Sequence, residues 1–131
     1  MGKLDELHPI LRRKVKAVLA DLEGHGLHPV IAVAWRSPAD QVKAFKQGHS
    51  QVRWGFHCAT YPDGRPCALA CDVVDAKKGW GAPAKFWKLL ASSRDAHGLH
   101  MAYAADRAHV QLLPNSMLKR VRGGWLPPEK D

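Results

Sequence analysis

The sequence has no run of apolar residues approaching the roughly 20 that are needed to cross a bilayer. Its first residues, MGKLDELHPILRRKVKAVL, place acidic residues before the apolar stretch and basic residues inside it. This pattern is typical of an amphipathic helix and not of the uninterrupted apolar core of a signal peptide. We therefore expect a chain that is made in the cytoplasm, is not exported by a signal of its own and does not insert stably into a membrane.

Cysteine is scarce, and no internal repeat or low-complexity segment is present. The three cysteines, Cys58, Cys67 and Cys71, are an odd number in a chain without a signal peptide, which argues against an obligatory disulfide framework. A length of 131 residues is nevertheless sufficient for a hydrophobic core. We expect one domain over residues 1–131, with a loose tail from about residue 126 to 131.

Acidic residues are outnumbered by basic ones, 12 to 20, which leaves a formal net charge of +8. Such an excess favours an anionic partner through long-range attraction. The basic residues are spread along the chain without a nucleic-acid-binding motif, so we expect no nucleic acid. The anionic surface of a bacterial envelope matches the positive charge equally well, and we expect it to be the partner. We expect the protein to be a monomer.

Periodicity and capping signals predict alternating helices and strands. Ser37 is expected to cap a helix that begins at Pro38, because serine is a favoured N-cap and proline a favoured first helical residue. The order predicts a small α+β domain with a mainly antiparallel sheet flanked by helices. The expected helices cover residues 9–24, 38–47 and 83–97, and the expected strands cover 29–35, 68–74, 99–103 and 109–113.

Asp72 lies in an apolar strand, where a carboxylate is costly to bury unless it is paired or bound to metal. A lone Asp at a strand edge, or paired with an Arg, is the simpler interpretation. Together with His57 and His109, however, it would supply the three ligands of a catalytic zinc site that leaves a fourth position for water. Asp75 is the competing third ligand. The other histidines are expected on surfaces or at helix ends: His8, His25, His28, His49, His97 and His100.

Two further polar residues are placed for catalysis. Asp106 precedes His109 by three residues and would sit beside an activated water as general base. Arg36 follows a buried strand and would clamp a substrate carboxylate or a developing oxyanion. The simpler alternatives are a turn-capping Asp and a surface Arg.

A different class of protein is suggested by the cysteines. His57 with the three cysteines has the inventory of a Cys₃His structural zinc module, for which the positive charge would indicate nucleic acid. The chain lacks the paired C-x₂-C spacing of such modules, and this interpretation leaves Asp72, Asp106 and His109 without a role.

Taken in order, these segments resemble the D-alanyl-D-alanine carboxypeptidase and L-alanyl-D-glutamate endolysin family of zinc peptidases, in particular its small phage endolysins. The resemblance covers roughly residues 30–113. The matching segments are Trp35-Arg36-Ser37 with Gln41, then His57, then Ala68-Leu69-Ala70-Cys71-Asp72, then Gly98-Leu99, and finally Asp106-Arg107-Ala108-His109.

The resemblance implies a zinc peptidase that acts on peptidoglycan stem peptides, on the L-alanyl-D-glutamate bond or, alternatively, as a D-alanyl-D-alanine carboxypeptidase. An endolysin of this kind waits in the host cytoplasm and acts on the cell wall after release. The implied roles are zinc binding for His57, Asp72 and His109, general base for Asp106, clamp for Arg36, and substrate binding for Arg36, Ser37 and Gln41.

The sequence departs from the family pattern inside the metal motif. Gly55 replaces a serine, Ala68 replaces a glycine, and the tryptophan expected after Gly-Leu is missing near Met101. The interval between His57 and Asp72 is longer than the family's, which implies an insertion around residues 58–67. A disulfide between its ends, Cys58 and Cys67, would close that insertion as a flap.

Overall fold

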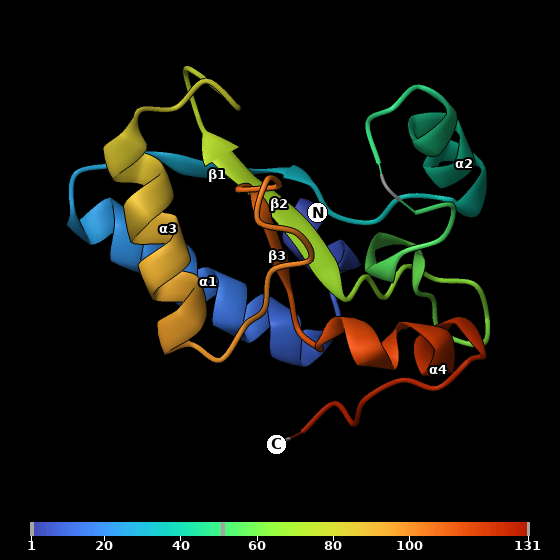
Figure 1. Ribbon diagram of the computed structural model, residues 1–131. Helices are drawn as coiled ribbons and strands as arrows, with labels where there is room; N and C mark the ends of the chain where they lie inside the picture. The colour runs from blue at the N-terminus through green and yellow to red at the C-terminus, as the bar shows by residue number, and fades with distance from the viewer. Residues whose placement is uncertain (1, 51, 131) are drawn as a thin grey trace.

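The computed structural model describes residues 2–50 and 52–130, which form a three-stranded sheet with helices on both sides (Figure 1). This is the α+β architecture with an antiparallel sheet that the sequence predicts. The helices are α1 (Pro9–Gly24), α2 (Pro38–Lys46), α3 (Ala84–Ala96) and α4 (Leu118–Arg122), the strands are β1 (Pro29–Val33), β2 (Ala70–Asp75) and β3 (His109–Gln111), and short 3-10 helices are η1 (Lys3–Glu6), η2 (Phe56–Cys58) and η3 (Asn115–Met117). None of the described helices combines the length and the apolarity that crossing a membrane requires.

The central strand of the sheet, β2, pairs antiparallel with β1 on one side and with β3 on the other. Asp72 lies opposite Val33 of β1 and opposite His109 of β3. Directly opposed residues of antiparallel strands project to the same face of a sheet. The register alone therefore brings the side chains of Asp72 and His109 together.

Local capping chemistry sets the helix boundaries as the sequence predicts. The Ser37 Oγ accepts a hydrogen bond from the Asp40 backbone N–H at 3.1 Å, and Pro38 is the first residue of α2. After α2 and α3 the chain turns through Gly48 and Gly98 at φ of 77° and 69°. Glycine adopts this left-handed conformation without steric cost, so each helix stops there.

The core is formed by α1 and α3, which contact each other beside the sheet, while α2 lies on the opposite side of the molecule (Figure 1). The apolar faces of both helices are buried together with β2. The largest buried side chains include Leu11, Leu22, Leu69, Phe86 and Leu90.

Phe86→Ala is expected to lower the free energy of unfolding by about 3–5 kcal/mol, because it leaves a cavity in a packed core. Phe86 is 0% exposed and packs edge-on against Trp87, with ring centroids 5.1 Å apart. Urea unfolding followed by circular dichroism measures the loss. Phe45→Ala, on the half-buried face of α2, is the matched control, and an equal loss in both variants would contradict this placement of the core.

The expected strand at residues 99–103 is wrong. Only His100 pairs with the sheet, through two backbone hydrogen bonds with Gln111, and by Tyr103 the chain turns, because the Tyr103 carbonyl accepts from the Asp106 N–H. The segment therefore leaves the sheet after one bridge and becomes a loop. The short helix α4 was not predicted.

The C-terminal segment is attached to the domain in two places, which the prediction of a loose tail did not include. The Pro127 carbonyl lies 2.8 Å from His8 Nε2, and the Tyr61 hydroxyl donates to Glu129 at 2.8 Å. Residue 131, the last of the predicted tail, lies outside the described residues.

Candidate metal centre

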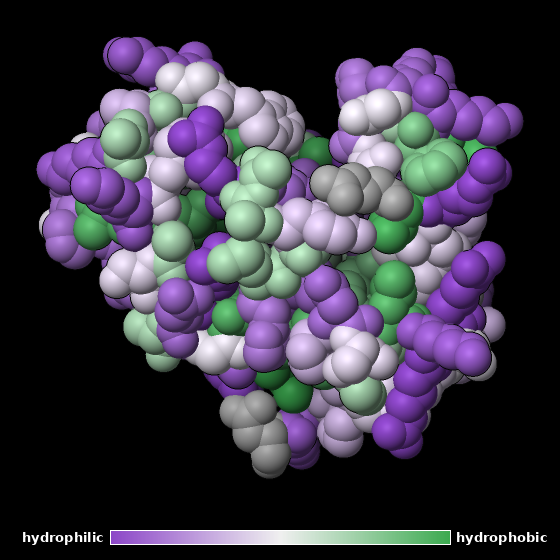
Figure 2. Space-filling model, in the orientation of Figure 1, coloured by the Kyte–Doolittle hydropathy of each residue, from purple (hydrophilic) through white to green (hydrophobic). Residues whose placement is uncertain are grey.

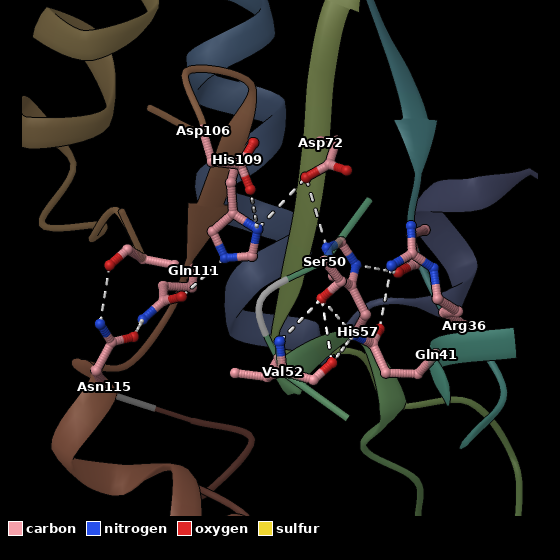
Figure 3. A network of polar contacts seen from close by, with 12 residues as sticks. Arg36, Gln41, Ser50, Val52, His57, Asp72, Asp106, His109, Gln111 and Asn115 are labelled. Carbon is pink, nitrogen blue, oxygen red and sulfur yellow. Dashed lines mark hydrogen bonds and ion pairs between the residues drawn. The ribbon is translucent and has the colours of Figure 1, made fainter. Parts of the chain in front are cut away.

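Three side chains from different elements meet in a buried cluster: His57 of η2, Asp72 of β2 and His109 of β3 (Figure 3). Asp72 Oδ1 lies 3.5 Å from His57 Nε2 and 3.4 Å from His109 Nδ1. The three residues are only 7%, 8% and 7% exposed. This is the set that the sequence predicted as metal ligands, and the fold brings its members together.

Each imidazole is oriented by a hydrogen bond on the side away from the cluster. His57 Nδ1 lies 2.7 Å from the Ala34 carbonyl oxygen, which can only accept, so this nitrogen carries the proton. His109 Nε2 lies 2.7 Å from Gln111 Oε1. The other nitrogen of each ring faces Asp72 across the cluster, where a metal ion could bind it, which is how metal-binding histidines are usually held.

The donor set fits a zinc ion. Two nitrogen ligands and one carboxylate leave the fourth tetrahedral position open. Ligand atoms at about 2.0–2.1 Å from one tetrahedral ion are roughly 3.3 Å apart, close to the two distances from Asp72 Oδ1. That oxygen is also buried without a hydrogen-bond donor in the described part of the chain. The group could therefore hold a metal ion.

Asp72 and His109 of the cluster shift each other's pKa values through electrostatic attraction. Burial alone would raise the pKa of Asp72, but its interactions with His109 and His57 outweigh burial and hold this pKa below its usual range. Burial lowers the pKa of His109, yet the attraction of Asp72 outweighs it, and the net pKa is raised. Asp72 is thus an anion at neutral pH and is available to a cation.

Asp106 stands beside the cluster without belonging to it. Its Oδ2 lies 3.8 Å from His109 Nδ1, and its side chain is 45% exposed. Burial first, and the charge of Asp72 second, raise the pKa of Asp106. A half-exposed carboxyl with a raised pKa is suited to accept and return a proton.

The cluster opens into a cleft of about 550 Å³. In Figure 2 the surface is indented between the part that carries α2 and the part that carries the sheet. Arg36 lines the cleft on the α2 side, while Trp80 and Tyr103 line it together with Asp106. The cluster can therefore be reached from solvent through this cleft.

Gln41 holds Arg36 in this cleft. Its Oε1 accepts from Arg36 Nη1 at 3.1 Å, and its Nε2 donates to Ser50 Oγ and to the Val52 carbonyl, both at 2.7 Å (Figure 3). Gln41 is only 1% exposed, so its amide is engaged within the protein. Gln41 therefore orients Arg36, and it also lines the cleft, so the substrate contact expected from the sequence stays a prediction.

Other predicted residues lie elsewhere. Ser37 uses its hydroxyl to cap α2 and is not among the described residues that line the cleft. Asp75, the competing ligand, accepts from the backbone N–H groups of Lys77 and Lys78 at 3.0 and 2.8 Å in an exposed turn. The register of β2 therefore selects Asp72 and not Asp75.

The cysteines form no metal site. Within residues 2–50 and 52–130, the cluster around Asp72 is the one group of at least three His, Cys, Asp or Glu residues that could hold an ion. Cys71 is fully buried in the core, and burial raises its pKa. Cys58 and Cys67, between which the sequence leaves a disulfide open, are buried free thiols in this structure. The Cys67 N–H donates to the Ala59 carbonyl instead, so a backbone hydrogen bond closes the inserted segment.

Sequence reasoning missed the residues on the outer side of His109. Gln111 is 1% exposed and bonds to His109, while Asn115 bonds to Gln111. The spacing of two residues along a strand places Gln111 on the same face as His109, which is the signal that could have revealed it.

Comparisons with known proteins show the fold. No family model matches the chain, and no curated protein matches it by sequence. The crystal structure of the Serratia marcescens L-Ala D-Glu endopeptidase ChiX is similar, with a TM-score of 0.60 over 85% of this chain and 84% of that chain and with 20% sequence identity. The chain therefore has the fold of that endopeptidase.

Proposed function

We propose that this protein is a zinc-dependent peptidase that hydrolyses the L-alanyl-D-glutamate bond of peptidoglycan stem peptides. The observation that carries the proposal is the buried cluster of His57, Asp72 and His109 at the base of an open cleft. The similar fold of an L-Ala D-Glu endopeptidase supports the choice of bond.

His57 Nε2, His109 Nδ1 and an Asp72 carboxylate oxygen would hold the zinc ion. When bound, the ion supplies Lewis-acid chemistry, which activates water and polarises the scissile carbonyl. The chain's own contribution is to fix both imidazoles and to keep Asp72 ionised. Because all three side chains are buried, little reorganisation is needed when the substrate arrives.

Asp106 is the general base in this proposal. Its carboxylate takes the proton from the attacking water and then returns it to the leaving amine nitrogen as the C–N bond breaks. The new products are a carboxylate and a free amino group. Burial and the charge of Asp72 raise the pKa of Asp106, which makes its carboxylate a stronger base for the first of these transfers.

Arg36 clamps the substrate. Its guanidinium lines the cleft and would donate to a substrate carboxylate or to the oxygen that becomes negative in the transition state. The net charge of +8 would draw the protein towards an anionic envelope. A role as a phage endolysin that acts after release from the host cytoplasm is consistent with this chemistry and is part of the proposal.

Digestion of a soluble stem pentapeptide, followed by mass spectrometry, tests the function. We expect release of N-terminal L-alanine, loss of release with a chelator, and recovery with zinc. Release of D-alanine would instead assign the protein as a D,D-carboxypeptidase. The absence of any cleavage by the zinc-loaded protein, on this peptide and on isolated peptidoglycan, would contradict the proposal.

A further inference from the structure

A chain of hydrogen bonds leads from the outer edge of His109 to the loop that precedes Asp106 (Figure 3). Gln111 Oε1 lies 2.7 Å from His109 Nε2. Gln111 Nε2 donates to the Leu113 carbonyl at 2.8 Å and to Asn115 Oδ1 at 2.9 Å. Asn115 Nδ2 in turn donates to the Ala102 carbonyl at 3.0 Å.

The carbonyl of Ala102, at the last of these hydrogen bonds, determines which group donates and which accepts in each of them. The Ala102 carbonyl can only accept, so the amide nitrogen of Asn115 must face it and Asn115 Oδ1 must face Gln111. The Leu113 carbonyl likewise requires the amide nitrogen of Gln111. Gln111 Oε1 is therefore left to face His109, and His109 Nε2 must carry the proton.

We infer that Gln111 is a positioning residue that selects the tautomer and orientation of His109, and that Asn115 ties the same chain to the loop carrying Asp106. This inference rests on the proposed function, since it gives the lone pair of His109 Nδ1 a metal to bind. Gln111 is 1% exposed, so water does not readily take its place. In the opposite tautomer, the lone pair of Nε2 would face the lone pairs of Gln111 Oε1.

The second part of the inference concerns the loop. Ala102 lies one residue before Tyr103, whose carbonyl accepts from the Asp106 N–H at 3.1 Å, and the Asp106 carbonyl accepts from the His109 N–H at 3.3 Å. Asn115 therefore fixes the start of the loop whose end presents Asp106. The same series of hydrogen bonds therefore orients the imidazole of His109 and positions the loop that carries Asp106.

Zinc affinity of the metal-free protein, measured by competition with a chelating dye, tests the first part. Gln111→Leu is expected to weaken zinc binding about 10–100-fold, as loss of such an outer partner does in other zinc sites. Gln111→Glu keeps an acceptor for His109 but no longer donates to the Leu113 carbonyl and to Asn115 Oδ1, so it is expected to bind zinc more tightly than Gln111→Leu and more weakly than the wild type. Gln47→Leu, at an exposed position after α2, is the control and is expected to bind zinc as the wild type does.

Asn115→Asp separates the two parts, because aspartate still accepts from Gln111 but no longer donates to Ala102. We expect zinc affinity to stay within about twofold of the wild type while kcat on the stem pentapeptide falls by up to about 10²-fold, since a small displacement of a catalytic group is costly. Asn115 is exposed, so this variant is expected to fold. An unchanged kcat would overturn the role of Asn115.

The failure of this inference differs from the failure of the proposed function. A wild-type protein that binds no zinc would contradict the function itself. A wild type that binds zinc, with Gln111→Leu folded and binding equally tightly, would overturn the positioning role alone. If Gln111→Leu does not fold, the zinc-loaded wild type decides. Its ¹⁵N chemical shifts are expected to show His109 protonated on Nε2, and a proton on Nδ1 would overturn the inference.

Discussion

Asp106→Asn is expected to lower the rate of stem-peptide hydrolysis by about 10²–10⁴-fold while zinc remains bound, because a general base contributes that much to such a reaction. Asparagine has nearly the same shape as aspartate but cannot take the proton of the attacking water. Asp106 lies 3.8 Å from His109 Nδ1 and outside the ligand cluster, so its loss leaves the ligands in place. Initial rates and zinc content of the same preparation measure both effects.

Asp95→Asn is the matched control for this substitution. Asp95 is exposed on α3, away from the cleft, and pairs with Arg94 at 3.0 Å. Its change is expected to leave hydrolysis and zinc content unaltered. Loss of zinc from Asp106→Asn would show that Asp106 is a ligand, and an unchanged rate would show that the base is another group.

His57→Ala and His109→Ala are each expected to lose both zinc and hydrolysis. Each removes one of three protein ligands, which costs more affinity than the roughly 10–100-fold that follows loss of an outer partner. His28→Ala removes an exposed histidine away from the cleft and is expected to keep both properties. Equilibrium dialysis against zinc, followed by elemental analysis, measures the difference.

The cysteine variants complete this experiment. Cys67→Ser and Cys71→Ser are expected to retain zinc as long as they fold, since Cys71 lies in the core and neither residue belongs to the ligand cluster. A structural zinc module would behave in the opposite way. Zinc lost from the serine variants but kept by His109→Ala would contradict the assignment of the metal centre.

The parts of the fold that sequence predicts well are those with strong local signals. The proline and serine at the start of α2 and the glycines after α2 and α3 act within one helical turn, so residues near Ser37, Gly48 and Gly98 set the boundaries themselves. A carboxylate in an apolar strand, as at Asp72, is likewise visible in the sequence because burying it needs a compensating partner.

The parts that sequence does not predict depend on contacts between distant segments. Residues 99–103 have the apolar character of a strand, but only His100 reaches Gln111 before the chain turns. The attachment of the tail depends on His8, which is 119 residues away from Pro127. No local pattern encodes such pairs.

The residues of the site also differ in how well the sequence predicts them. The three residues that the fold brings together around Asp72 could be picked out from residue type, spacing and a family resemblance, because metal binding is restricted to few residue types. Gln41, which bonds to Arg36, and Gln111, which bonds to His109, are glutamines that in the sequence could equally be surface residues. Only their burial and their fully used amide groups reveal their task.

Anomalous X-ray scattering at the zinc absorption edge, from crystals of the protein purified without chelator and equilibrated with zinc, tests the central claim most directly. We expect one strong peak about 2.0–2.1 Å from His57 Nε2 and from His109 Nδ1 and within bonding distance of the Asp72 carboxylate, at the base of the cleft. A peak at Cys58, Cys67 or Cys71, or no peak at the Asp72 cluster, would contradict the assignment of this cleft as a zinc peptidase site.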